Sequence, residues 1–243
     1  DPYGDKHMGI CAESCAREYK LAREEQDAFS RESYARARAA QESGLFASEI
    51  VPVEIVSRKG TTVVDRDEEP GKSDLEKMAG LKPAFEKDGT VTAANASKIN
   101  DGAAALVLAT GDEVKRLGVK PIARLVSQAS HAQKPEWFTT APVAAIRKAL
   151  DRAGLTVADI DLFEINEAFA VVALACMRDL GIAHEKLNVR GGAVALGHPI
   201  GASGARILVT LLAALEERDL RRGCAGICIG GGEATAVVVE RLA

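Results

Sequence analysis

Residues 161–180, DLFEINEAFAVVALACMRDL, decide the class of fold. The first five residues favour a short strand, and the apolar residues that follow Asn166 favour a buried helix. A strand that leads directly into a buried helix is typical of α/β proteins. Aromatic residues make up only 4% of the chain, whereas glycine occurs 22 times, and this balance favours tight α/β packing over a β-sandwich filled by large rings.

The sequence on both sides continues the alternation. Residues 122–130 (IARLVSQAS) predict a strand, and residues 141–154 (APVAAIRKALDRAG) predict a helix. A glycine-rich loop leads into a further helix at 202–217, and two apolar strands follow at 225–230 and 234–242. The order is therefore strand, helix, strand, helix, loop, helix, strand, strand, with the last two strands antiparallel.

The first half of the chain is less regular. A charged, alanine-rich segment predicts an amphipathic helix from about Glu24. Residues 49–56 (EIVPVEIV) predict a strand, and residues 57–90 predict irregular surface. An apolar strand is expected at 103–109, followed by a helix near 112–117.

Length, charge and cysteine content bound the class of protein. The 243 residues suffice for one large or two modest domains, and no apolar run reaches the ~20 residues that a membrane helix needs. Lys and Arg number 31 against 35 Asp and Glu, so the net charge is −4 and no global field attracts nucleic acid. The five cysteines form no C-x-x-C pair, which indicates a reducing, cytoplasmic compartment.

Two polar residues in the second half could carry chemistry, and each also has a plainer interpretation. Asn166 stands between a strand and a helix, where an asparagine most often caps the helix. His198 lies in a glycine-rich loop that could be only a tight turn. Here, however, Gly197 and Pro199 fix the backbone on both sides, so that the imidazole projects from a defined point.

Two further features concern a cysteine and a small-residue loop. Cys228 ends a strand just before three glycines, and it is either a small buried hydrophobe or, once deprotonated, a base or nucleophile. Residues 92–97 (TAANAS) form either an ordinary turn between domains or a surface that a ligand approaches closely. Cys11 and Cys15 lie four residues apart but supply too few ligands for a metal site.

A histidine, a cysteine, an asparagine and backbone donors on separate loops could supply a base, an oxyanion site and enolate stabilisation for thioester chemistry. In these loops the chain resembles thiolases of the acetyl-CoA C-acetyltransferase (acetoacetyl-CoA thiolase) type. The motifs are NEAF, N-x-x-GG-x-V-x-x-GHP-x-G-x-SG and C-x-GGG, in family order and spacing, together with HMG, EEQDAF, VTAANAS and NDGAAA. The match extends over essentially the whole chain.

The resemblance implies an α/β thiolase fold, layered α-β-α-β-α. We expect residues 1–99 to form an α+β loop domain that cradles coenzyme A. Residues 100–120 are then the tail of a largely absent N-terminal repeat, and residues 121–243 are the complete C-terminal repeat. Thiolases carry their nucleophilic cysteine in a segment that would precede Asp1, and no cysteine here matches it. We therefore expect the later part of a longer protein.

The resemblance also implies a role for each catalytic position. His198 would take the proton of the nucleophilic cysteine, and Cys228 would exchange a proton with the α-carbon of acetyl-CoA. Asn166 would hold a water that forms one oxyanion site with His198, and the N–H of Gly230 would contribute to a second. The implied reaction is the reversible conversion of two acetyl-CoA into acetoacetyl-CoA and CoA by a ping-pong mechanism.

Ligand positions follow from the same resemblance. Those implied to contact coenzyme A are Met8, Phe85, Ala93, Ser97, Ile99, Ala168 and Phe169. Phe138 matches a subclass in which a potassium ion lies near the pantetheine loop. Its ligand positions correspond to Tyr34, Ala93, Ala94, Ala96 and Val194, although Tyr34 also suits an ordinary helix-face aromatic.

Two other functions stay open at this point. A longer-chain 3-ketoacyl-CoA thiolase would use the same motifs, and a truncated chain could bind CoA without catalysis. The full-length protein is expected to be a homodimer or homotetramer, because thiolases assemble in this way. The same residues would serve condensation and cleavage.

Overall fold

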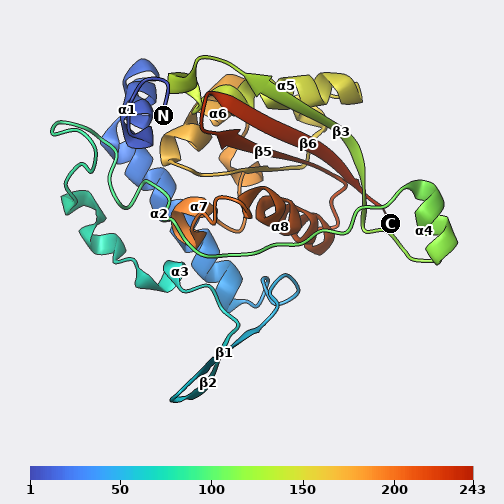
Figure 1. Cartoon of the computed structure of the whole chain (residues 1–243). Coiled ribbons are helices and arrows are strands. Elements are labelled where there is room, and N and C mark those ends of the chain that lie inside the picture. The colour runs from blue at the N-terminus through green and yellow to red at the C-terminus, as the bar shows by residue number, and fades with distance from the viewer. Residues whose placement is uncertain (243) are drawn as a thin grey trace.

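In the computed structural model of the chain, which describes residues 1–242, the later half folds around one mixed four-stranded sheet (Figure 1). Its strands are β3 (Ala123–Ala132), β4 (Leu162–Ile165), β5 (Arg222–Ile229) and β6 (Glu233–Arg241), in the order β3-β6-β5-β4. Strand β6 is antiparallel to both of its neighbours, and β4 is parallel to β5. The predicted strands and the antiparallel final pair are confirmed.

Helices cover both faces of this sheet. Helix α5 (Ala141–Ala153) packs on β3, β6 and β5, whereas α8 (Ser203–Glu217) packs on β4 and β5 (Figure 1). A Cβ on Gly226 would meet Ile146 of α5 at 3.0 Å, and one on Gly223 would meet Leu211 of α8 at 2.8 Å. Because odd and even positions of a strand point to opposite faces, the two helices lie on opposite sides of the sheet.

Helix α6 (Ala170–Leu180) is buried on the α5 side of the sheet, as its nearly continuous apolar sequence predicts. Helices α1 (Met8–Glu18) and α2 (Arg23–Glu42) pack against it, and α2 also contacts the short helix α7 (Ala193–Leu196). The predicted amphipathic helix thus begins one residue earlier than Glu24. The first half of the chain therefore forms a layer over the site-bearing loops of the second half.

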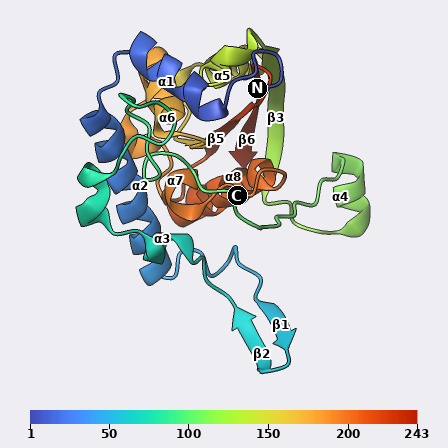
Figure 2. The same cartoon turned by 60° about the vertical axis from the view of Figure 1, so that its left-hand side comes forward.

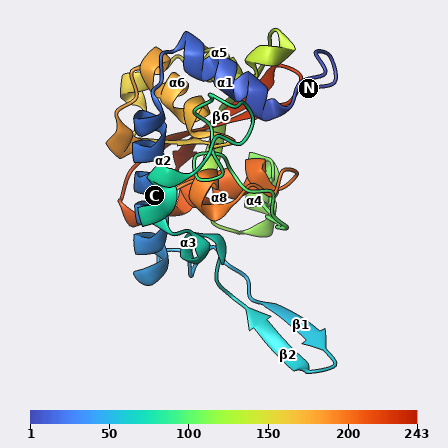
Figure 3. The same cartoon turned by 90° about the vertical axis from the view of Figure 1, so that its left-hand side faces the viewer.

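The segment after α2 differs from the prediction. Strand β1 (Val53–Ser57) starts later than expected, because the Glu49 carboxylate instead accepts hydrogen bonds from Arg190 and Thr210 of the later half of the chain. A second strand, β2 (Gly60–Val64), pairs with it as an exposed hairpin that projects from the body of the molecule (Figures 2 and 3). The expectation of wholly irregular surface at 57–90 was therefore wrong.

Short helical segments follow the hairpin and lie against α2. They are α3 (Glu69–Lys72) and the 3₁₀ turn η1 (Leu75–Gly80), which leads into the extended loop toward residue 100. Further 3₁₀ turns connect the later elements and lie at Pro135–Trp137, Val157–Asp159 and His184–Lys186.

The strand expected at 103–109 is absent from the structure. These residues form no ladder, and Val107 and Leu108 are exposed, as is the short helix α4 (Gly111–Leu117) that follows. Apolar, β-prone residues become a strand only where a partner strand completes the hydrogen bonds. None of the described strands pairs with this segment. Among residues 1–242, no helix is both long and apolar enough to cross a membrane.

Candidate active site

The loop that carries His198 is fixed by its glycines and by the neighbouring chain. Helix α7 ends at Leu196 and is followed by Gly197, whose φ of 94° lies in the left-handed region that favours glycine. A Cβ there would also lie 2.2 Å from Oδ1 of Asn100. The next N–H, that of His198, donates to the carbonyl of Lys98 at 2.8 Å. The backbone therefore holds the imidazole at one point in the fold, as predicted.

The hydrogen bonds of the imidazole define its tautomer. Ser203 Oγ donates to the Pro199 carbonyl at 3.1 Å, so its oxygen is left to accept from Nδ1 of His198 at 2.5 Å. With the proton on Nδ1, Nε2 carries the lone pair and accepts from Nδ2 of Asn166 at 3.3 Å. Burial and the charge of Arg206 lower the pKa of His198 from its ordinary value. The ring is therefore a neutral base with Nε2 as its basic atom.

Asn166 contributes a second polar atom to this point. The residue is fully buried directly after β4, and its backbone N–H donates to Gly226 of β5 at 3.0 Å. Its Oδ1 is buried without a hydrogen-bond partner, an arrangement that leaves an acceptor for a small polar ligand such as water. The N-cap interpretation was wrong: α6 begins after Phe169, and no side chain caps it.

Cys228 lies at the same end of the sheet as Asn166. Ile165 pairs with Gly226 across the parallel strands β4 and β5, and Cys228 follows two residues later on β5. Carboxyl ends of parallel strands are where α/β proteins bind ligands. Burial raises the pKa of the Cys228 thiol to about 12, so the sulfur is protonated at neutral pH.

A glycine turn follows Cys228 and joins β5 to β6. Gly231 and Gly232 have φ values of 95° and 86°. A Cβ on Gly232 would lie 2.4 Å from the carbonyl of Gln133. Gly230 lies beside Met8, since a Cβ on this glycine would come within 3.8 Å of the methionine Cε. The turn thus brings the predicted Gly230 donor next to one of the predicted coenzyme A positions.

The buried carboxylate of Glu167 supports this site through hydrogen bonds, and this role was not predicted from the sequence. Glu167 Oε2 accepts from Ser33 Oγ at 2.8 Å and from the Val194 N–H at 3.1 Å, while Oε1 accepts from Asn188 Nδ2 at 2.8 Å. Burial raises the pKa of this carboxyl, and the donors oppose the effect. A Cβ on Gly192 would lie 2.3 Å from the carboxyl carbon. The only signal in the sequence was the position of Glu167 within NEAF.

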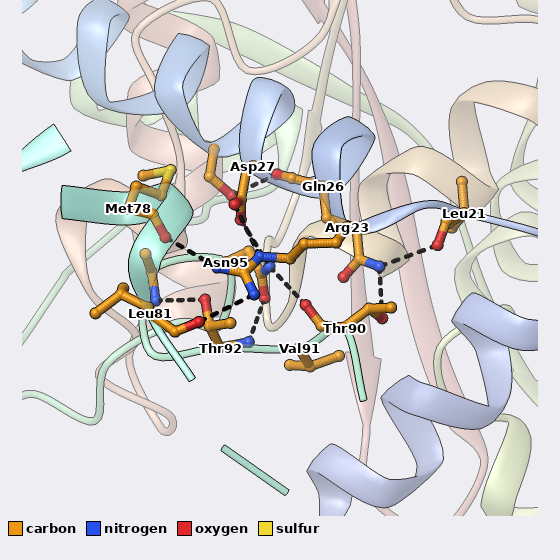
Figure 4. A network of polar contacts seen from close by, with 12 residues as sticks. Leu21, Arg23, Gln26, Asp27, Met78, Leu81, Thr90, Val91, Thr92 and Asn95 are labelled. Atoms are coloured by element: carbon orange, nitrogen blue, oxygen red, sulfur yellow. Dashed lines mark hydrogen bonds and ion pairs between the residues drawn. The ribbon is translucent and has the colours of Figure 1, made fainter. Parts of the chain in front are cut away.

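The small-residue loop (residues 92–97) is anchored to helix α2. Asn95 Nδ2 donates to Asp27 Oδ1 at 3.0 Å and to the Thr90 carbonyl at 3.1 Å, and Asn95 Oδ1 accepts from the Thr92 N–H at 2.8 Å. Figure 4 shows these contacts beneath α2. Both Thr92 and Asn95 are fully buried. Residues 92–97 therefore form a turn, in which the Asn95 N–H donates to the Thr92 carbonyl at 3.3 Å, and the close approach of a ligand to it stays a prediction.

Most of the predicted coenzyme A positions gather around this loop. The Ser97 N–H donates to the Ala168 carbonyl at 3.0 Å, Ala96 bridges to Phe169, and Ile99 bridges to His198. Phe169 also meets the rings of Phe85 at 6.0 Å and Phe138 at 6.3 Å. Ala93 and Ile99 are exposed on this surface, whereas Met8 lies at the separate Gly230 turn.

Two of the oxygens predicted to bind potassium, those of Tyr34 and Val194, contact a lysine. Lys98 Nζ donates to the hydroxyl of Tyr34 and, at 2.9 Å, to the carbonyl of Val194. It also lies 4.7 Å from the centre of the Tyr34 ring, which is itself fully buried. The described residues hold no cluster of three or more His, Cys, Asp or Glu that could bind a metal. A free cation does not fit between Tyr34 and Val194 while Lys98 binds both.

Comparison with known families accounts for both halves of the chain. The model of the thiolase C-terminal domain matches residues 119–241, and that of the thiolase N-terminal domain matches residues 1–112. The chain is 54% identical to a probable acetyl-CoA acetyltransferase of Dictyostelium discoideum over 100% of its own length and 59% of that protein. It is 55% identical to an acetyl-CoA acetyltransferase of Escherichia coli over 97% and 60%, respectively.

Solved structures give the same result for the fold. The acetyl-CoA acetyltransferase of Bacillus anthracis superposes with a TM-score of 0.97 at 45% identity, covering 100% of this chain and 62% of that one. The Acat5 thiolase of Ascaris suum, solved with coenzyme A, gives 0.93 at 47% identity, with the same coverage of both chains. The predicted α/β thiolase fold is confirmed. The chain spans about three fifths of the length of the curated relatives that it matches.

Proposed function

Since this chain belongs to the thiolase family, we propose that it forms part of an acetyl-CoA C-acetyltransferase. The reaction is the reversible conversion of two acetyl-CoA into acetoacetyl-CoA and CoA by a ping-pong mechanism. The observation that supports it best is the arrangement of Asn166 and His198, which combines a lone pair on Nε2 with a buried, unpartnered amide oxygen. Acyl transfer needs such a base next to a polar site for an oxyanion.

In the first half-reaction, Nε2 of His198 takes the proton of the family's nucleophilic cysteine. The resulting thiolate attacks the carbonyl carbon of acetyl-CoA, and the C–S bond to CoA breaks. CoA leaves as the thiol after taking up a proton from the imidazolium. The lowered pKa of His198 favours the neutral imidazole that this step requires.

In the second half-reaction, the Cys228 thiol passes its proton to Nε2 of His198, and the resulting thiolate removes the α-proton of another acetyl-CoA. The enolate oxygen is held by a water on Asn166 together with the Nε2–H of the His198 imidazolium, and the N–H of Gly230 stabilises the oxyanion at the acetyl-enzyme. A new carbon–carbon bond forms, and the nucleophilic cysteine departs as the thiolate and takes its proton back from the imidazolium. In reverse, the Cys228 thiol protonates the enolate, which suits the raised pKa that keeps its proton in place at rest.

Coenzyme A is proposed to lie across the loop domain of residues 1–99 and to reach the C-terminal domain of residues 121–243. The exposed Ala93 and Ile99 and the packing of Ser97 on Ala168 support this path. Residues 100–120 would be the tail of the N-terminal repeat. We propose no step through potassium, because the Lys98 ammonium binds two of the implied ligands, the oxygens of Tyr34 and Val194.

The compartment and the oligomeric state of the protein are part of the same proposal. All five cysteines are free and buried, which supports a reducing, cytoplasmic compartment. A homodimer or homotetramer of the full-length protein is supported by the exposed apolar side chains of the β1–β2 hairpin, including those of Val53 and Ile55. Light scattering on the full-length protein tests the assembly, and a monomer would contradict it.

The activity is tested by following cleavage of acetoacetyl-CoA by CoA, with a series of longer 3-ketoacyl-CoA substrates for comparison. A longer-chain 3-ketoacyl-CoA thiolase is the second candidate, because the human mitochondrial enzyme of that name superposes with a TM-score of 0.93 at 40% identity. The buried Phe138 against Phe169 favours short acyl chains. A kcat/KM that falls as the chain lengthens supports the first function, and a rise supports the second. Binding of CoA without turnover would indicate a non-catalytic chain.

A further inference from the structure

Lys98 forms hydrogen bonds with both ends of the turn from Val194 to His198. Its side-chain ammonium donates to the carbonyl of Val194 at the start of α7, and its backbone carbonyl accepts from the N–H of His198. The Val194 N–H is bound at the same time by Glu167. The N–H of Val194 is therefore fixed by the Glu167 carboxylate, and its carbonyl is fixed by the Lys98 ammonium.

The surroundings of the ammonium are those of a binding site for a small monovalent cation. The Tyr34 hydroxyl oxygen accepts from Lys98, and it also accepts from Ser73 Oγ at 2.8 Å. The Tyr34 ring presents its face to the same charge at 4.7 Å. A phenolic oxygen, a carbonyl oxygen and an aromatic face all attract a hard cation, and they come from two segments of the chain, because Tyr34 supplies the first and the last and Val194 supplies the carbonyl.

We propose that the Lys98 ammonium is a tethered monovalent cation that positions the Val194–His198 turn, and that its removal opens a site for a free potassium or ammonium ion. Lys98 is a positioning residue, because it touches the turn and not the reacting atoms. Its effect on turnover rests on the function proposed above. The existence of the cation site does not, because ion binding changes stability whether or not the protein is catalytic.

The structure suggests three substitutions with different outcomes. Lys98→Ala removes the ammonium and leaves space between Tyr34 and Val194. Lys98→Met removes the charge but fills much of the same space with an apolar chain. Lys115→Ala is the matched control, because Lys115 is an exposed lysine of α4 far from any site described here.

Melting temperature, kcat and KM are measured for the complete protein in potassium, ammonium and choline chloride at equal ionic strength. We expect wild type and Lys115→Ala to be indifferent to the choice of salt. Lys98→Ala in choline chloride should lose up to about a hundredfold in kcat, with KM little changed, as expected for a misplaced base. Potassium or ammonium should restore kcat saturably and raise the melting temperature by about 2–4 °C. Lys98→Met should lose kcat without recovery in any salt.

Two results would overturn the proposal. One is saturable activation or stabilisation of wild type by potassium, which would show that a free ion binds despite Lys98. The other is a folded Lys98→Ala variant whose melting temperature and kcat do not respond to potassium or ammonium. A wild type that fails to turn over acetoacetyl-CoA would instead contradict the proposed function. The melting experiment would still decide whether the cation site exists.

Discussion

Asn166 Nδ2 donates to His198 Nε2 over 3.3 Å, although the two residues are 32 positions apart in the chain. The bond joins the end of β4 to the loop that follows α7. It also orients the two side chains so that the imidazole lone pair and the unpartnered amide oxygen belong to one site.

Asn166→Ala should lower the rate of carbon–carbon bond formation more than the rate of enzyme acylation. The substitution removes the amide that we expect to hold the water, and this water is the donor to the enolate oxygen. The loss of one oxyanion donor costs about 10²–10³-fold in kcat. Single-turnover kinetics with acetyl-CoA separate the two steps. Equal loss in both steps would show that Asn166 acts through the position of His198 instead.

Ser203→Ala should weaken His198 as a base without removing it. The hydroxyl is the acceptor that keeps the imidazole proton on Nδ1. Without it the other tautomer gains population, and part of the ~10²–10⁴-fold contribution of general base catalysis is lost. Stopped-flow acylation rates measure the effect. A Ser203→Ala rate equal to wild type would rule out the tautomer assignment, with Ser203→Thr as the variant expected to retain function.

The acid limb of the pH–rate profile should lie below the ordinary pKa of histidine. Burial and Arg206 lower the pKa of His198, so the imidazole stays neutral to a lower pH than in the unfolded chain. The folded state therefore binds fewer protons than the unfolded state between the two pKa values, and stability is lost as pH falls through this window. Arg206→Gln should shift the limb in kcat/KM to higher pH. An unchanged limb would show that Arg206 has no influence on His198.

Gly192→Ala should lower the stability of the protein by about 1–3 kcal/mol. The added methyl would meet the Glu167 carboxyl carbon at 2.3 Å, and that carboxylate is held by three donors. Gly80→Ala is the control, because a Cβ at Gly80 meets nothing within 4 Å. Urea unfolding compares the two variants. The prediction fails if both variants unfold at the same midpoint.

The sequence predicted the parts of the fold whose pattern is local. The apolar runs around Asn166 and Cys228 gave the strands of the main sheet, because burial on both faces leaves a clear signal. The apolar run at 103–109 gave a wrong strand, since its pattern says nothing about whether a partner strand lies beside it. Strand β2 was missed because an exposed hairpin carries no alternation of apolar and polar residues.

The residues that we propose as reactive could be singled out from the sequence, whereas the residues that support them could not. Asn166, His198 and Cys228 stand in motifs whose glycines and prolines mark a fixed backbone. Glu167 and Lys98 look like ordinary charged residues in the sequence, and their roles depend on contacts with segments far away in the chain. Only the fold shows that a carboxylate and an ammonium hold the same residue, Val194.

The division of labour between His198 and Cys228 is the central claim, and intact mass after incubation with acetyl-CoA tests it most directly. The complete protein should gain one acetyl group and release acetoacetyl-CoA. Cys228→Ala should gain the acetyl group but form no acetoacetyl-CoA, because only the second half-reaction needs its thiol. His198→Ala should gain none. Acetylation of His198→Ala at the wild-type rate, or loss of acetylation in a folded Cys228→Ala, would contradict the account.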